Sequence, residues 1–300
     1  MKKKTYLFAL MAMVLTLGSC SDNENGIGGE TSKYITVSTS IGNMTRVATD
    51  EKGGQTFEEG DEISVYAWTG DATVAPETRE RVVNNAINKL TNGSWISNPQ
   101  MLWKNNRDKH YFIGVYPISA ISDLSAGEYT FDETKQVESD LLVAVNKDGL
   151  SCNVDEQQPV PLTFTHVMAK LVVNLTYKNQ WGGIPTVEKV VVGNAAKEAT
   201  INYLTKVVTP SATAKEDFSL PEITENTKYV SVIIPQEEVT QLTIVIGGKN
   251  FVYDNGTPFK LESGKITTVN LEVGRDEIKL GDVKITNWED GSTFSGEALN

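Results

Sequence analysis

The sequence predicts an all-β protein made of antiparallel β-sandwiches, and three observations support this. Apolar and polar residues alternate, with β-branched and aromatic side chains on one face, as in residues 34–41 and 63–68. The strand-like runs are about eight residues long or shorter, and turn signals return roughly every ten residues, as in sandwiches and barrels. No strand–helix–strand spacing appears, which disfavours a doubly wound parallel sheet.

Dipeptides that favour a positive φ separate the strand-like runs and predict hairpin turns. The clearest predicted hairpin joins residues 241–246 to residues 250–253 through a pair of glycines. The four turn dipeptides are Asn92-Gly93, Asp148-Gly149, Gly247-Gly248 and Asn255-Gly256.

Residues 79–90 are ambiguous, because their apolar residues fall at helical spacing. Asn84, Asn85 and Asn88 are poor helix formers, however, and Asn92-Gly93 is typical of a hairpin tip. We predict a strand here, with an amphipathic helix as the alternative.

The length of 300 residues suggests about two domains. Residues 155–161 combine a polar run with two prolines that flank Val160, which disfavours continuous strand pairing. We therefore predict one sandwich over residues 47–157 and a second over residues 158–300.

Composition excludes several functions. The formal charge of −12, from 27 basic and 39 acidic residues, disfavours binding to nucleic acid or to anionic lipid surfaces. Two histidines and two cysteines are too few for a multi-histidine metal centre or a four-thiolate zinc site. The sequence contains no hydrolase elbow, zinc-protease motif or phosphate loop, so we expect no enzyme activity, no cofactor and no metal site.

Three features with possible chemistry have simpler explanations. The acidic residues between Glu58 and Glu62 are adjacent rather than alternating, which favours a solvated turn over a calcium loop. His166 lies among apolar residues and is expected to be a hydrogen-bonded core or edge histidine. The tryptophans could stack on sugar rings, but most lie in or beside apolar runs that favour core packing: Trp68, Trp95, Trp103, Trp181 and Trp288.

The N-terminus is a predicted export signal. Three lysines precede an apolar run over residues 6–17, which is too short to span a bilayer comfortably. Leu17-Gly18-Ser19-Cys20 resembles a bacterial lipobox, which predicts a signal peptide over residues 1–19 and a lipid on Cys20. An ordinary secretory signal with a chance cysteine is the alternative. Removing residues 1–19 deletes three lysines and changes the formal charge to −15.

A polar, glycine-containing tether follows Cys20, and its acidic start resembles the surface-export signal of lipoproteins in Gram-negative gut and oral anaerobes. Arg46 then lies between a predicted strand and a polar loop, where a protease could cut before Val47. The alternative is an ordinary loop arginine.

Taken together, the order of these elements resembles the fimbrillin family, the type V pilins of Gram-negative anaerobes. The resemblance covers nearly the whole chain, and the order and spacing of its pieces are more specific than any single piece. The matching features are the lipobox at Cys20, the strand and arginine at 34–46, residues 57–67, Trp95, Trp103, and residues 112–117, 139–144, 164–171, 234–236 and 285–291.

This resemblance implies two tandem transthyretin-like β-sandwiches and a strand-exchange assembly. An arginine-specific surface protease would cut after Arg46, leaving a subunit of charge −14, and remove the propeptide 20–46 with its first strand. The vacated groove would accept a strand from a neighbouring subunit. The removable strand contains Tyr34, Ile35, Val37 and Ile41, and the candidate donor strand contains Ile278, Leu280, Val283 and Ile285, with a bulge or bend near Gly281.

The implied partners are other fimbrial subunits, the protease, and a host or bacterial surface ligand. The implied location is the outer membrane, through the lipid on Cys20 before processing, and then the cell-surface fimbrium. Stalk, tip and anchor roles remain open; Arg46 and the C-terminal extension favour a stalk, whereas Trp288-Glu289-Asp290-Gly291 is more typical of a folded turn than of a free donor strand. The competing class is a glycan-binding surface lipoprotein of a polysaccharide importer, and a secreted hydrolase has no motif in its favour.

Overall fold

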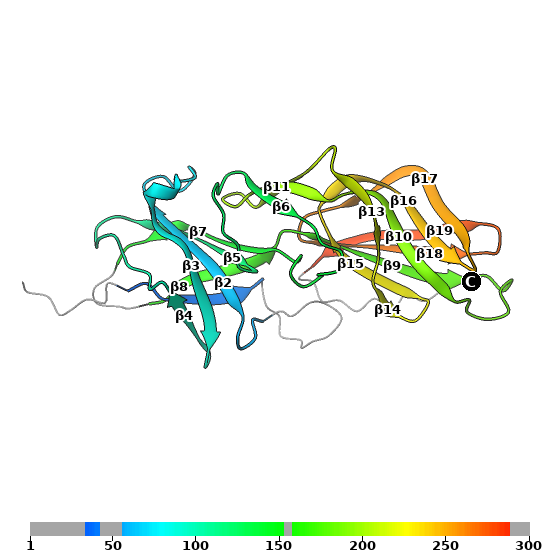
Figure 1. The fold of residues 1–300 in the computed structure, drawn as a ribbon, viewed down its shortest axis with the longest axis horizontal. Coiled ribbons are helices and arrows are strands. Elements are labelled where there is room, and N and C mark those ends of the chain that lie inside the picture. The colour runs from blue at the N-terminus through cyan, green and yellow to red at the C-terminus, as the bar shows by residue number, and fades with distance from the viewer. Residues whose placement is uncertain (1–33, 43–55, 153–157, 289–300) are drawn as a thin grey trace, which may run out of the picture. The chain divides into compact units, whose positions relative to one another are not determined.

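A computed structural model describes residues 34–42, 56–152 and 158–288 of the chain, and they belong to one compact unit (Figure 1). The described residues are nearly all β, as predicted, with one 3₁₀ turn, η1 (Thr78–Glu80). No helix in this part of the chain is long and apolar enough to cross a membrane. The strands are β1 (Val37–Ile41), β2 (Glu62–Thr69), β3 (Arg81–Thr91), β4 (Ser94–Asn98), β5 (His110–Tyr116), β6 (Gly127–Thr130), β7 (Leu142–Leu150), β8 (Val160–His166), β9 (Ala169–Tyr177), β10 (Val187–Ala196), β11 (Glu198–Asn202), β12 (Val207–Pro210), β13 (Lys215–Ser219), β14 (Glu222–Thr224), β15 (Lys228–Ile233), β16 (Gln236–Ile246), β17 (Lys249–Leu261), β18 (Lys265–Val273) and β19 (Ile278–Asn287).

The first half of the chain forms a seven-stranded sheet in the order β1-β8-β7-β5-β2-β3-β4. Its interior strand β2 is buried on both faces, since Val65 and Tyr66 are adjacent and both fully buried. Val65 belongs to a core that also contains β1 and β8, whereas Tyr66 belongs to a larger core that reaches Ile201 of the small sheet β12-β11-β6. The sheet therefore has apolar packing on each side.

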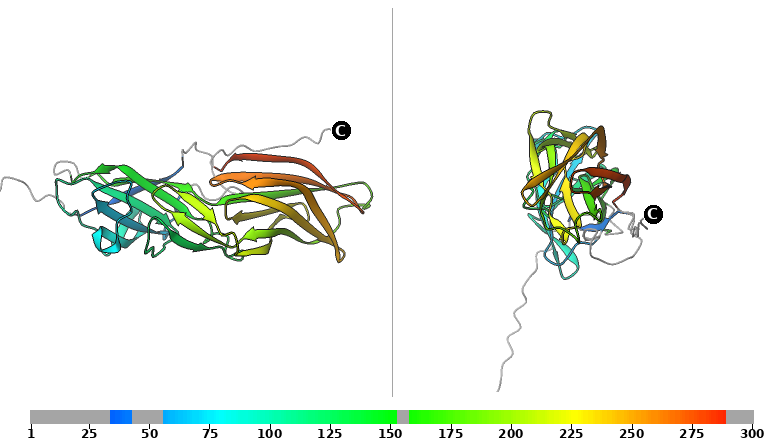
Figure 2. Two further views of the ribbon diagram at one scale, coloured as in Figure 1. Left: turned by 90° about the horizontal axis from the view of Figure 1, so that it is seen from above. Right: turned by 90° about the vertical axis from the view of Figure 1, so that its right-hand side faces the viewer.

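The remaining strands form a sandwich of a five-stranded sheet, β14-β15-β9-β18-β19, and a four-stranded sheet, β13-β10-β16-β17. Leu171 and Val269 of the first sheet and Val192 and Ile244 of the second are fully buried in the same core. Figure 2 shows β19, in dark red, beside β18 at the edge of its sheet.

The ambiguous segment 79–90 is mainly strand β3, as predicted. Two of the four predicted turns are confirmed: Asn92-Gly93 (φ 51° and 72°) joins β3 to β4, and Gly247-Gly248 (φ 59° and 72°) joins β16 to β17. The other two were wrong, because Asp148-Gly149 lies within β7 and Asn255-Gly256 within β17. Both dipeptides lie beside shifts in strand register, where a positive φ or an extra residue serves a bulge rather than a hairpin.

The predicted sheets were antiparallel, but two ladders are parallel: β1 with β8, and β9 with β18. Turn signals report only hairpins between neighbouring strands, so they carry no information on these long-range pairs. The predicted boundary near residue 157 remains a prediction. In the structure β8, which follows it, pairs with β7 and β1, and the first strand of the five-stranded sheet is β9.

His110 joins the start of β5 to the loop before it. The imidazole is fully buried; its Nε2 accepts a hydrogen bond from the Lys104 backbone N–H (3.0 Å), and its Nδ1 lies 3.0 Å from the Asp108 carbonyl oxygen. These contacts fit a neutral ring that donates from Nδ1. Burial, as the largest cause, lowers the pKa of His110 below its ordinary value of 6.5.

We therefore expect His110→Phe to destabilise the fold by about 1–3 kcal/mol at pH 7.5, through loss of two buried hydrogen bonds. Because the folded-state pKa is lowered, this stabilisation is complete above the ordinary pKa and is lost as the pH falls through the folded-state value. The difference in the free energy of unfolding between wild type and variant should narrow from pH 7.5 to pH 5.0. Urea denaturation at both pH values measures it, and a constant difference would contradict this assignment.

Candidate functional site: strand β1 and its groove

Strand β1 lies at an edge of the seven-stranded sheet and has one strand neighbour among the described residues. It pairs with β8 in parallel over five residue pairs, from Val37 with Val160 to Ile41 with Phe164. Just before the strand, the Ile35 N–H donates to the Met101 carbonyl oxygen at 2.9 Å. Backbone hydrogen bonds to β8 and to the Met101 segment therefore hold this strand.

The inward side chains of β1 complete the smaller core. Ile35, Val37 and Ile41 are 2%, 6% and 7% exposed, whereas Tyr34 is 45% exposed. Thus three of the four residues predicted for the removable strand are core residues, and Tyr34 is not. Burial of three such side chains contributes about 5–8 kcal/mol, which is of the order of a whole domain's stability.

Two cavities adjoin β1. We call these cavities, together with the space that β1 itself occupies, the β1 groove. One, of about 700 Å³, runs along β1 and is bounded on the other side by Trp95 and Ile96 of β4. Trp95 Nε1 donates to Thr39 Oγ1 at 2.9 Å across it. The second, of about 600 Å³, begins at Ile41 and continues past His166 to Val230 and Val232 of β15. The apolar surface therefore continues beyond the end of β1.

Phe57 closes the floor of the β1 groove. Its ring makes edge contacts with Trp95, Tyr116 and Phe164, at centroid distances of 5.3, 5.3 and 5.1 Å. The Tyr116 hydroxyl donates to Asp61 Oδ1 at 3.3 Å, and burial followed by the nearby Asp61 charge raises the pKa of Tyr116 to about 12. Sequence reasoning did not assign Phe57 to this site, because its aromatic partners come from distant strands.

The acidic residues after Phe57 make hydrogen bonds and an ion pair within their own turn and with the neighbouring β3–β4 hairpin. Asp61 Oδ2 accepts from the Glu58 N–H (2.7 Å), Glu59 accepts from the Asn92 N–H (2.5 Å), and Glu62 pairs with Lys89 (3.1 Å). These contacts agree with the predicted solvated turn. Within the described ranges, no group of three or more His, Cys, Asp or Glu side chains has the arrangement of a metal site.

Strand β19, the candidate donor, is an edge strand paired with β18. The register shifts at Gly281, where a bulge or bend was expected, so the four apolar residues lie opposite buried residues of β18. All four side chains therefore lie on the face of β19 that continues the buried face of β18. Val283 and Ile285 are nevertheless 37% and 39% exposed, while Ile278 and Leu280 are partly buried against the larger core.

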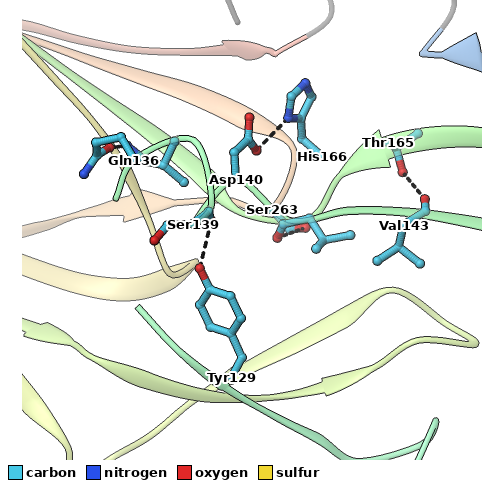
Figure 3. A network of polar contacts seen from close by, with 10 residues as sticks. Tyr129, Gln136, Ser139, Asp140, Val143, Thr165, His166 and Ser263 are labelled. Atoms are coloured by element: carbon cyan, nitrogen blue, oxygen red, sulfur yellow. Dashed lines mark hydrogen bonds and ion pairs between the residues drawn. The ribbon is translucent and has the colours of Figure 1, made fainter. Parts of the chain in front are cut away.

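Trp288, directly after β19, anchors the end of this strand to β8. Its side chain is 2% exposed and stacks on the His166 ring, with centroids 4.1 Å apart and planes 4° apart. His166 Nδ1 lies 2.8 Å from Asp140 Oδ1 (Figure 3), and the Lys170 ammonium lies 5.4 Å from the Trp288 ring. The expectation of a hydrogen-bonded His166 is confirmed. Its stacking on Trp288 was missed, since 122 residues separate the two positions in the printed sequence.

The predicted lipidation site Cys20 and the predicted cleavage site, Arg46 and Val47, lie outside the described residues. Gly42, the last described residue before the cleavage site, donates its N–H to the Phe164 carbonyl oxygen at 2.8 Å. The lipidation site and the cleavage site remain predictions.

Comparisons with known proteins agree with this architecture. A curated relative, named as a candidate fimbrium subunit Fim1C of Bacteroides uniformis, is 24% identical over 315 aligned positions that cover 97% of each chain. Crystal structures described as candidate cell adhesion proteins, from Bacteroides ovatus and Bacteroides uniformis, have the same fold. Their TM-scores are 0.63 and 0.60 at 17% and 16% identity; each alignment covers 85% of this chain and 98% or 99% of the other.

The profile of the fimbrillin-like family matches residues 45–288, which is most of the chain and includes nearly all of the described strands. The protein therefore belongs to the fimbrillin-like family.

Proposed function

We propose that this protein is a subunit of a cell-surface fimbria, exported as a lipoprotein on Cys20 and activated by a cut after Arg46. The cut leaves β1 bound through noncovalent contacts alone, so that the strand can be replaced by one from another subunit. The observation that carries this proposal is that β1 is an edge strand with three core side chains and one ladder. Its loss opens a groove that needs a substitute strand.

The apolar spacing of β19 suits the vacated slot. The inward positions of the removable segment are Ile35, just before β1, and Val37, Thr39 and Ile41 within it, and they alternate without interruption. In β19 the four apolar residues share one face only because of the bulge at Gly281. We infer that the donor strand keeps this bulge in the groove, with Val283 opposite Trp95 in place of Thr39.

Release of β19 from its own sheet is the main cost of this assembly. The strand has one strand neighbour in the part of the chain that the structure describes, and two of its inward side chains are more than one-third exposed, so little apolar contact holds its second half. Trp288 is the exception, because it is nearly fully buried against His166. A stalk subunit must both accept and donate a strand, and we favour that role over a tip or an anchor.

The first test is processing. An arginine-specific protease should convert the purified full chain to a form that begins at Val47, which then assembles into a detergent-resistant ladder on electrophoresis. Arg46→Ala should block both the new N-terminus and the ladder, because Arg46 is the only arginine in the sequence between β1 and β2. Mass spectrometry identifies the N-terminus.

Arg79→Ala is the matched control, since Arg79 is exposed within η1 and its ion pair among the described residues is with Glu77. It should assemble as the wild type does. A chain that is cut at Arg46 and stays monomeric, or an Arg46→Ala chain that still polymerises, would contradict the proposal.

The second test separates β19 as donor from β19 as an ordinary edge strand. Val283→Asp should change the monomer's melting temperature by only a few degrees, because Val283 is already 37% exposed. In the groove the same carboxylate would take the place of the half-buried Thr39, with the Trp95 N–H as a single donor, and its incomplete solvation would cost about 1–3 kcal/mol. We expect at least a tenfold loss of polymer, measured by size-exclusion chromatography after processing.

Val252→Asp is the control, since Val252 is an exposed apolar residue (46%) on β17, which contributes no donor residue. Equal polymer yields from Val283→Asp and wild type would show that β19 is not the donor strand, even if cleavage at Arg46 is required.

A further inference from the structure

A cavity of about 740 Å³ lies away from the β1 groove, between β2, the η1 turn and the segment that precedes His110. Its wall includes Trp68, Trp103 and the exposed apolar side chains of Val74 (59%) and Leu102 (45%). This volume is in the range of pockets for small ligands. Nothing in the strand-exchange proposal uses it.

Cations gather at this cavity although the chain as a whole is acidic, at −12. The cavity wall contains Arg79, Arg81 and Lys104, which include two of the five arginines of the sequence. Its acidic residues, Asp71 and Glu80, are occupied by local hydrogen bonds. Asp71 Oδ1 accepts from the Thr73 N–H and hydroxyl, both at 2.7 Å, and Glu80 Oε2 accepts from the Glu77 N–H at 3.1 Å.

Two of the three cations have no carboxylate within ion-pair distance in the part of the chain that the structure describes. Lys104 Nζ donates to the Thr69 hydroxyl at 3.1 Å, and Arg81 donates to the Ile121 and Ser122 carbonyl oxygens at 2.7 and 2.6 Å. Arg81 is 8% exposed, and its buried Nε has no partner among the described residues. The Asp123 charge acts on Arg81 from beyond ion-pair distance and offsets it in part, and the positive charge that remains at the cavity favours an anionic ligand.

Contacts with buried residues hold Trp103 and Lys104 in place. The Lys104 N–H donates to the buried His110 at 3.0 Å, and Trp103 packs edge-on against His110 and Phe112 at centroid distances of 4.9 and 5.7 Å. Trp103 is only partly buried, so part of its ring remains available on the cavity side. An aromatic ring next to a held ammonium group suits the apolar face of a pyranose that carries a carboxylate.

We propose that this cavity binds an acidic sugar, with the sugar ring against Trp103 and its carboxylate on Lys104, while Arg79 keeps its ion pair with Glu77. The buried guanidinium group of Arg81 adds a second positive charge at the cavity wall. Such a site would give the fimbrial subunit a surface ligand of its own.

The test is a ligand-observed NMR titration of the purified full chain with three free sugars: N-acetylneuraminic acid, galacturonic acid and galactose. Galactose is the matched neutral counterpart of galacturonic acid. We expect at least one acid to bind at least tenfold more tightly than galactose. If both acids bind, the carboxylate is the shared determinant. If N-acetylneuraminic acid alone binds, the ligand has a sialylated source. If galacturonic acid alone binds, the ligand has a uronic-acid source.

Lys104→Ala should weaken acid binding at least tenfold, whereas Lys104→Arg should retain most of it. Lys109→Ala is the control, because Lys109 is exposed five residues along the chain and donates to the Asp148 carbonyl oxygen at 3.2 Å. Lys104 is exposed, so the fold should survive its replacement, which an unchanged melting temperature verifies. The proposal is overturned if no acid binds, if galactose binds equally, or if Lys104→Ala binds as the wild type does.

Discussion

The parallel ladder between β1 and β8 is the interaction on which the rest of the proposed mechanism depends. It lies at a sheet edge, so it can be lost without breaking any other ladder of the seven-stranded sheet. Yet Ile35, Val37 and Ile41 are nearly fully buried, so its loss is too costly to leave uncompensated. A strand that is topologically dispensable and energetically needed is what an exchange mechanism requires.

The two edge strands differ in how they are held. β1 contributes its apolar face to a core, whereas the second half of β19 leaves Val283 and Ile285 partly open to solvent. Transfer of β19 into a vacant β1 groove would bury these side chains and restore a full ladder to β8. In the proposed exchange the apolar area gained would set the direction, and the stack of Trp288 on His166 would oppose premature release.

The cavity that contains Lys104 is built from different parts of the same sheet. β2 supplies Trp68, the η1 region supplies Arg79 and Arg81, and the segment before β5 supplies Trp103 and Lys104. None of these residues lines the β1 groove. Trp103 nevertheless packs against the core that β1 completes, and Leu102 of the cavity wall pairs with Tyr34, so the proposed ligand site borders the proposed assembly site.

The sequence by itself determined the all-β class, β1, β3, two hairpins, and the face shared by Ile278, Leu280, Val283 and Ile285. These follow from alternation and from turn dipeptides, which act over a few neighbouring residues. Tertiary structure alone decided the parallel pairing of β1 with β8, the closure of the groove by Phe57 and the burial of Trp288 on His166. It also decided that Asp148-Gly149 and Asn255-Gly256 continue their strands. Each of these depends on contacts between segments far apart in the chain, and local pattern carries no record of which distant strand will complete an edge or cover a ring.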